Sequence, residues 1–139
     1  MTEPAVKPLR PEDAERYASD AARLYRQAGW IGAGDPDSDL VPILRNSWCV
    51  MGAFDGSGKL IGMMRALSDG VSDAYLLDMV VEESRRGQGI AGRILGELVS
   101  VLKKNGIDWI VCISVPEAEG LYARQGEVMK KHIPFRFRG

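Results

Sequence analysis

Two apolar segments separated by an amphipathic one most restrict how this chain can fold. Ala74–Val81 is apolar on both faces of a strand except for Asp78, and Trp109–Val115 is a second such run. Strands of this kind lie in the interior of a sheet. Parallel neighbours need a long crossover, which is usually a helix. We therefore expect a parallel, right-handed strand–helix–strand unit over residues 74–115.

The segment between the two runs has the spacing of a helix. It begins at Gly89, carries Lys103 and Lys104 in its last turn and stops at Asn105-Gly106, as is typical of helix C-termini. Its apolar residues recur every three or four positions: Ile90, Ala91, Ile94, Leu95, Leu98, Val99 and Leu102.

The rest of the chain also predicts elements of both kinds. Periodicity and turn residues indicate a short apolar start at Val6–Leu9, a helix from Pro11 to Ala28 that ends at Gly29, a short helix over Leu40–Leu44, a hairpin of Trp48–Phe54 with Leu60–Leu67, a short helix from Glu117 to Gly126, and a final strand or hairpin arm over Val128–Phe137. Pro134 places that last strand at an edge. The predicted fold class is α/β, a mixed α+β sheet flanked by helices, in a single domain over residues 1–139.

Charge and composition exclude several partners. Eighteen basic and nineteen acidic residues give a net charge of −1, which offers little attraction to a polyanion, so we expect no nucleic acid partner. No stretch approaches the ~20 apolar residues that cross a bilayer, so we expect no membrane partner. The first sixteen residues carry charges and prolines where a secretory signal needs an apolar run, so we expect a cytoplasmic protein.

The cysteines and the single histidine also limit the chemistry. Cys49 and Cys112 both lie in apolar runs, which predicts buried thiols that belong to the core. His132 is the only histidine. We therefore expect neither a multi-histidine metal site nor a Ser-His-Asp triad, and we predict no metal ligands.

The residues between the first strand and the helix are those most typical of a binding site. They are Arg85-Arg86-Gly87-Gln88-Gly89-Ile90-Ala91-Gly92. The first N–H groups of a helix have no partners within it and attract anions, and glycines let the backbone approach phosphate oxygens. The sequence thus predicts a diphosphate site here.

Three other interpretations fit this loop less well. Gly87, Gly89 and Gly92 satisfy the dinucleotide pattern G-x-G-x-x-G. However, five residues separate the strand from the first glycine, and Val111–Ile113 stands where a ribose-binding acid should be. The phosphate-loop pattern G-x-x-x-x-G-K-[ST] does not occur. A loop that only packs helix on strand leaves the adjacent arginines unexplained.

These residues resemble the GNAT superfamily of acetyl-CoA-dependent N-acetyltransferases. The family's pyrophosphate motif, [RQ]-x-x-G-x-[GA], corresponds to Arg86–Ala91, and its motif A-x-x-[FL]-Y-x-x-x-G corresponds to Ala118–Gly126. The chain departs from the family pattern at Glu83, at Val115-Pro116 and at Glu127. The resemblance extends over residues 9–137 and implies the GNAT-like acyl-CoA N-acyltransferase fold.

The resemblance implies an enzyme that moves the acetyl group of acetyl-CoA to a primary amine of a small molecule, by direct transfer in a ternary complex. It implies that Tyr122 donates a proton to the departing sulfur and that the backbone of the strand receives the pantetheine arm. The implied coenzyme-binding residues are Met79, Val80, Val81, Arg86, Gly87, Gln88, Gly89, Ile90, Ala91 and Gly92.

Each candidate catalytic residue has a structural alternative. Asp78, a lone carboxylate in an apolar strand, is our candidate for the base that deprotonates the amine, directly or through water; the alternative is a structural pair with Arg65 or Arg93, since buried carboxylates are usually paired. Tyr122 could be a core tyrosine on an apolar helix face. A catalytically silent acyl-CoA-binding or sensing domain is the alternative function, and a plain interaction module is the third.

The acceptor carries no motif of its own. Asp35, Asp37 and Asp39 crowd one loop, and Asp69 and Asp73 flank another turn. Gathered carboxylates attract a cationic amine, although aspartates are also common turn formers. We therefore expect a small-molecule amine partner that is cationic. A homodimer is possible, and the sequence does not decide it.

Overall fold

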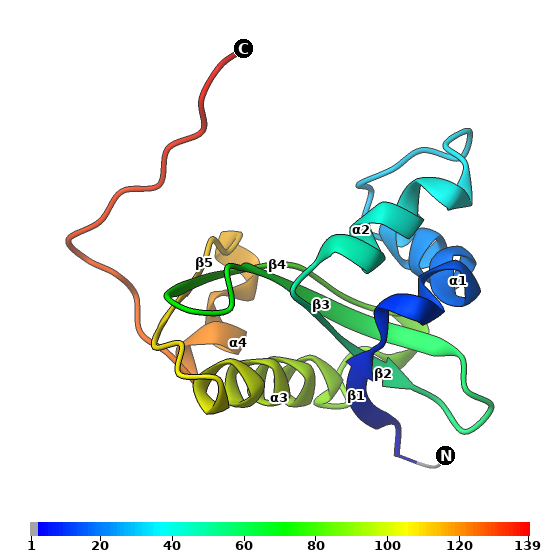
Figure 1. Cartoon of the computed structure of the whole chain (residues 1–139), viewed down its shortest axis with the longest axis horizontal. Coiled ribbons are helices and arrows are strands. Elements are labelled where there is room, and N and C mark those ends of the chain that lie inside the picture. The colour runs from blue at the N-terminus through cyan, green and yellow to red at the C-terminus, as the bar shows by residue number, and fades with distance from the viewer. Residues whose placement is uncertain (1–2) are drawn as a thin grey trace.

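The computed structural model describes residues 3–139, and its central feature is a five-stranded sheet (Figure 1). The strands are β1 (Ala5–Leu9), β2 (Cys49–Phe54), β3 (Leu60–Ser68), β4 (Asp73–Val81) and β5 (Trp109–Cys112). They lie in chain order. The first four strands pair antiparallel with one another, whereas β5 pairs parallel with β4. The predicted mixed sheet is confirmed.

Helices cover both faces of this sheet. They are α1 (Ala14–Gln27), α2 (Leu40–Asn46), α3 (Ile90–Lys104) and α4 (Glu119–Ala123), and short 3₁₀ turns precede α1, α2 and α4 at Pro11–Asp13, Asp37–Asp39 and Pro116–Ala118. Each matches a predicted helix to within a few residues. Gly29, with φ 78°, ends α1 as expected, because glycine adopts the left-handed conformation without steric cost.

The core lies on the two sides of the sheet. Alternate residues of one strand point to opposite faces, so Val50 and Met63 pack with α1 and α2, whereas Met51 and Met64 pack with α3. The buried face of α3 consists of Ile90, Ile94, Leu95, Leu98 and Leu102, five of the seven apolar residues in the predicted stripe.

The parallel unit is confirmed, since β4, α3 and β5 follow one another and residues 73–76 pair with residues 109–112. The prediction that Trp109–Val115 forms a buried strand is wrong. The strand ends at Cys112, Trp109 is 47% exposed, and Ile113 and Val115 are each 62% exposed. The run of apolar residues is present, but within residues 3–139 β5 has a neighbouring strand on one side only.

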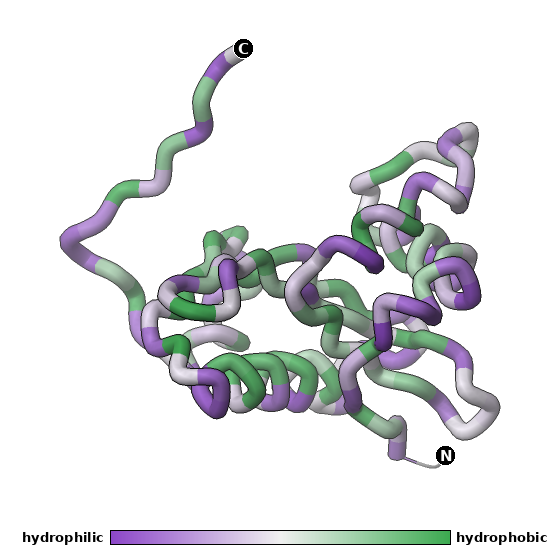
Figure 2. Tube along the Cα trace, in the orientation of Figure 1, coloured by the Kyte–Doolittle hydropathy of each residue, from purple (hydrophilic) through white to green (hydrophobic). Residues whose placement is uncertain are grey.

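The predicted final strand over Val128–Phe137 is not formed. After α4 the chain is exposed and extended, and it leads away from the sheet (Figure 1). Its apolar and charged residues alternate along the tube in Figure 2. The strand pattern is present in the sequence, but this segment pairs with no strand in the structure.

Both cysteines are free and only partly buried, so the prediction that they belong to the core holds in part. Burial raises the pKa of the Cys49 thiol to about 11.

Within residues 3–139, no helix has the length and apolar composition needed to cross a membrane. The same residues contain no group of three or more His, Cys, Asp or Glu side chains suited to a metal ion.

Candidate functional site

The loop between β4 and α3 has the geometry of an anion site. Gly87 and Gly89 adopt φ of 79° and 80°, and Gly89 is the N-cap of α3. A Cβ at either glycine would meet no atom within 4 Å, so the space beside the loop is open. Among residues 3–139, the backbone N–H groups of Gly87–Gly92 find no hydrogen-bond acceptor. These donors and the positive end of the helix dipole fit a diphosphate.

The two arginines of the loop have different tasks. Arg85 is buried, and its Nε donates to Gln88 Oε1 at 3.2 Å. Arg86 is exposed, and its Nε donates to the carbonyl oxygen of Val81 at 3.0 Å. The Arg85 contact fixes the fold of the loop. Arg86 keeps its terminal guanidinium nitrogens available to an anion, and its role in coenzyme binding stays a prediction.

A bulge in β4 lies just before this loop. Arg65 pairs with Leu77 and Met63 with Val80, so two residues of β4, Asp78 and Met79, stand opposite one residue of β3. Asp78 has φ 60° and is the one non-glycine residue with positive φ among residues 3–139. An extra residue with such a φ bends a strand, and strained backbone of this kind often occurs at functional sites.

Pairing between β4 and β5 stops at Leu76 and Cys112. We call Leu77–Val81 the unpaired edge of β4, because beyond Leu76 the side of β4 that faces β5 has no strand partner among the described residues. Met79 is partly buried, whereas Val80 and Val81 are buried. The predicted pantetheine residues therefore lie on backbone that can still form hydrogen bonds, directly before the anion loop.

Asp78 is held by two side chains. Its Oδ2 accepts hydrogen bonds from Arg65 Nε and from the Tyr25 hydroxyl, each at 2.7 Å, and Arg65 also reaches Ser47 Oγ at 3.4 Å. The Asp78 and Arg65 side chains are 22% and 16% exposed. Of the two structural pairs considered for Asp78, the one with Arg65 is present. The assignment of Asp78 as base stays a prediction.

Tyr25 is a site residue that sequence reasoning missed. It lies on the buried face of α1, and burial first, with the Asp78 carboxylate second, raises the pKa of its hydroxyl. The tyrosine therefore stays a hydrogen-bond donor to Asp78. Nothing in the helical spacing of α1 distinguishes Tyr25 from an ordinary core residue, and a partner 53 positions away leaves no local signal.

Tyr122 lies on α4, partly buried against the α3 side of the sheet. Burial first, and the nearby Cys112 thiol second, raise the pKa of its hydroxyl. No side chain or backbone group of residues 3–139 forms a hydrogen bond with this hydroxyl.

Gln125 Nε2 donates to the carbonyl oxygen of Gly92 at 2.9 Å, which attaches α4 to the first turn of α3. The Gln125 contact was not predicted.

The predicted acidic residues mainly hold their own turns. Asp35 Oδ2 accepts from the Gly32 N–H at 2.6 Å, and Arg26 donates to Asp37 at 2.7 Å. Asp69 accepts from the N–H groups of Val71 and Ser72, both at 2.8 Å. The Ser72 hydroxyl, which donates to Asp69 Oδ2 at 2.6 Å, lowers the pKa of Asp69 to about 2, with smaller contributions from the N–H groups of Ser72 and Val71. Turn formation is enough to account for Asp35 and Asp69, and the ion pair with Arg26 of α1 is enough to account for Asp37.

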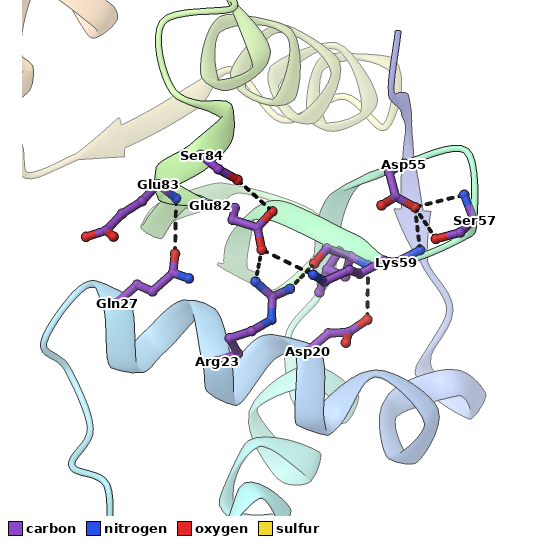
Figure 3. A network of polar contacts seen from close by, with 10 residues as sticks. Asp20, Arg23, Gln27, Asp55, Ser57, Lys59, Glu82, Glu83 and Ser84 are labelled. Carbon is purple, nitrogen blue, oxygen red and sulfur yellow. Dashed lines mark hydrogen bonds and ion pairs between the residues drawn. The ribbon is translucent and has the colours of Figure 1, made fainter. Parts of the chain in front are cut away.

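A network of polar contacts fastens α1 to the start of the anion loop (Figure 3). The Arg23 guanidinium pairs with Glu82 and donates to the carbonyl oxygen of Leu60 at 3.0 Å, and Lys59 Nζ lies 3.4 Å from Glu82. Further contacts join Asp20 to the Leu60 N–H and Gln27 to the Glu83 N–H. The helix that carries Tyr25 is thereby fixed relative to the loop that carries Arg86.

Comparison with known proteins places this geometry in a family. Residues 21–126 match the Acetyltransferase (GNAT) family. Serotonin N-acetyltransferase 2, chloroplastic, of Oryza sativa subsp. japonica is 32% identical over 82 residues, which are 59% of this chain and 41% of that protein. Uncharacterized N-acetyltransferase ycf52 of Pyropia yezoensis is 25% identical over 107 residues, 75% of this chain and 60% of that one. The chain thus spans about half the length of these curated relatives.

Solved structures agree on the fold. A Staphylococcus aureus protein described as a probable acetyltransferase superposes with a TM-score of 0.76 at 20% identity, over 96% of this chain and 99% of that chain. At this identity the likeness shows the fold alone. Together with the match over residues 21–126, it leads to one conclusion: the chain belongs to the GNAT family of acetyltransferases.

Proposed function

We propose that this chain transfers the acetyl group of acetyl-CoA to a primary amine of a small molecule, by direct transfer in a ternary complex. The observation that carries the proposal is that two stretches of backbone with unused hydrogen-bonding groups follow one another along the chain. The unpaired edge of β4 ends at Val81, and Glu82–Arg86 connect it to the N–H groups of Gly87–Gly92, which lack acceptors within residues 3–139. A long ligand with an amide-containing arm and a diphosphate fits that order.

Acetyl-CoA supplies an acetyl group activated as a thioester. Amide formation makes a nitrogen–carbon bond and breaks the carbon–sulfur bond, so the amine loses a proton and the departing sulfur gains one. Tyr122 is the donor for the sulfur, because its raised pKa keeps the hydroxyl protonated and no other group of the described residues accepts that proton. A backbone N–H near Met79 polarises the thioester carbonyl.

Asp78 is the acceptor of the amine proton, directly or through a water molecule. Arg65 and Tyr25 both bind Oδ2, so Oδ1 is the oxygen left for this task. Free alkyl amines are mostly protonated at neutral pH, and they need such a group before they attack. If Asp78 only pairs with Arg65, the base is Asp69, Asp73 or an ordered water.

The relatives suggest which amines to test first. The rice relative is named a serotonin N-acetyltransferase, so serotonin belongs in the panel beside polyamines, amino acids and peptides. A cationic acceptor has less support from Asp35, Asp37 and Asp69 than the sequence suggested, since Asp35 and Asp69 hold their own turns and Asp37 pairs with Arg26 of α1. The expected place of the enzyme in the cell is still the cytoplasm.

Titration calorimetry with acetyl-CoA tests the loop. Gly89→Asp places a carboxylate against the diphosphate, so we expect binding to be lost. Gly58→Asp is the matched control, because Gly58 also has positive φ, at 87°, and open space around its Cβ, but lies in the β2–β3 turn. Equal affinity in the two variants would refute the loop assignment.

Release of coenzyme A thiol over the amine panel separates the proposal from its alternative. Tight binding of acetyl-CoA with no thiol release for any amine would favour a silent acyl-CoA-binding or sensing domain. Binding of neither acetyl-CoA nor coenzyme A would leave an interaction module.

A further inference from the structure

The segment that carries Tyr122 is attached to the rest of the protein by a single hydrogen bond. Among the described residues, the one hydrogen bond that joins residues 114–139 to the preceding part of the chain runs from Gln125 Nε2 to the carbonyl oxygen of Gly92, at 2.9 Å. Leu121 and Tyr122 add apolar contacts, since both pack, partly buried, on the α3 side of the sheet. Few contacts therefore decide where the Tyr122 ring lies.

Helix α4 is too short to fix Tyr122 by itself. It spans the five residues Glu119–Ala123, and isolated helices of this length are not stable in water, so contacts with other elements determine its position. Gln125 lies just beyond the helix, and its backbone N–H donates to the carbonyl oxygen of Tyr122 at 3.1 Å. The side chain that contacts α3 is thus one hydrogen-bonded turn away from the candidate proton donor.

The surface of α3 that receives Gln125 is formed by two glycines. Gly92 and Gly96 are four residues apart, so they lie on the same face of the helix. A Cβ at Gly96 would stand 3.3 Å from Gln125 Oε1, which is tighter than an ordinary contact. Glycine is unfavourable inside a helix, and here its lack of a side chain lets the carboxamide lie against the helix and reach the Gly92 carbonyl oxygen.

We propose that Gln125 is a positioning residue, which holds Tyr122 relative to the anion loop so that the tyrosine hydroxyl meets the departing sulfur of acetyl-CoA. This inference rests on the proposed function, in which Tyr122 donates that proton. Gly92 takes part in both contacts. Its N–H belongs to the donors proposed for the diphosphate, and its carbonyl oxygen accepts from Gln125. Coenzyme binding at the loop therefore fixes the residue to which α4 is attached.

The kinetics of Gln125→Met test this role. Methionine has a similar length and no donor for Gly92, and Gln125 is exposed, so the variant should fold. We expect kcat to fall roughly tenfold, because a displacement of about 1 Å at a catalytic group costs up to about 10²-fold. KM for acetyl-CoA should stay within about twofold, since the loop keeps its own donors.

Arg124→Met is the matched control. The Arg124 side chain is exposed and forms no hydrogen bond or ion pair within residues 3–139, so kcat and KM should both stay as in the unmodified enzyme. An equal loss of kcat in the two variants would overturn the proposal, and so would a Gln125→Met enzyme with unchanged kcat.

A double-mutant cycle shows whether Gln125 acts through Tyr122. In a Tyr122→Phe background, Gln125→Met should lower kcat no further, because the group that it positions is already gone. Independent losses that multiply would assign Gln125 a different role and refute the positioning. Unchanged kcat in Tyr122→Phe alone would refute the proposed proton donor and this inference together, so the two failures are distinguishable.

Hydrogen exchange gives a readout that needs no turnover. The N–H groups of Gln125 and Gly126 both donate to the Tyr122 carbonyl oxygen, so their exchange rates report whether the end of α4 is formed. Coenzyme A should slow both amides in the unmodified chain. It should not slow them in Gln125→Met, although calorimetry should show that this variant still binds coenzyme A. Equal slowing in the two proteins would overturn the proposal.

Discussion

At the scale of single residues, Tyr122 and Asp78 differ in how firmly the rest of the protein holds them. The Tyr122 hydroxyl forms no hydrogen bond within residues 3–139, whereas Asp78 has two short ones and a left-handed backbone. A substitution at Tyr122 therefore tests chemistry almost alone. A substitution at Asp78 changes both chemistry and packing.

We expect Tyr122→Phe to lower kcat by about 10²-fold or more, the usual contribution of a positioned proton donor, while acetyl-CoA binding stays as in the unmodified enzyme. The ring and its packing remain, so the free energy of unfolding should hardly change. Steady-state kinetics on a verified acceptor and calorimetry measure the two quantities. Unchanged turnover would assign Tyr122 to the core.

We expect Asp78→Asn to cost about 1.5–3 kcal/mol of unfolding free energy, because a largely buried Arg65 then loses a charged hydrogen-bond partner. If Asp78 is the base, the rising alkaline limb of the pH–rate profile should also shift or disappear. Tyr25→Phe is the matched control, since it removes a bond to Asp78 and keeps the carboxylate. A profile identical to that of the unmodified enzyme would leave Asp78 a purely structural pair.

At the scale of elements, the contact between α1 and the anion loop depends more on the side chain of Glu82 than on that of Glu83. Glu82 accepts from Arg23 and Ser84 and lies near Lys59, whereas the exposed Glu83 contributes only its backbone N–H. We expect Glu82→Ala to lower the unfolding free energy by about 1–3 kcal/mol and Glu83→Ala to leave it within about 0.5 kcal/mol. Urea denaturation compares the two. Equal values would mean that this network adds nothing to stability.

Most elements were predictable because each has a local cause. The repeat of α3, its stop at Gly106 and the glycines of the loop all act within a few residues. The role of β5 was not predictable in this way, because an apolar strand has the same sequence whether or not a neighbour covers it. The loop glycines could be identified because their signal is local. Tyr25 was missed because its partner, Asp78, lies on a strand distant in the sequence.

At the scale of the whole molecule, two core clusters share one sheet. Leu24 is fully buried on the α1 side and Leu98 on the α3 side. We expect Leu24→Ala and Leu98→Ala each to cost about 2–5 kcal/mol. Because β2 and β3 contribute to both clusters, both variants should still unfold in one transition. Coincident curves by circular dichroism and tryptophan fluorescence would confirm this, and an early transition in either variant would contradict it.

The unpaired edge of β4 and the free N–H groups at the start of α3 also have a consequence for hydrogen exchange. Amides that lack an acceptor exchange with solvent as fast as those of mobile loops, even where the surrounding strands are slow. The middle of this fold should therefore contain a fast-exchanging patch bordered by slow strands. Hydrogen exchange in that patch becomes slow only when another molecule accepts hydrogen bonds from these N–H groups. The exchange rate of the backbone therefore reports whether a ligand is bound, without a label and without any turnover.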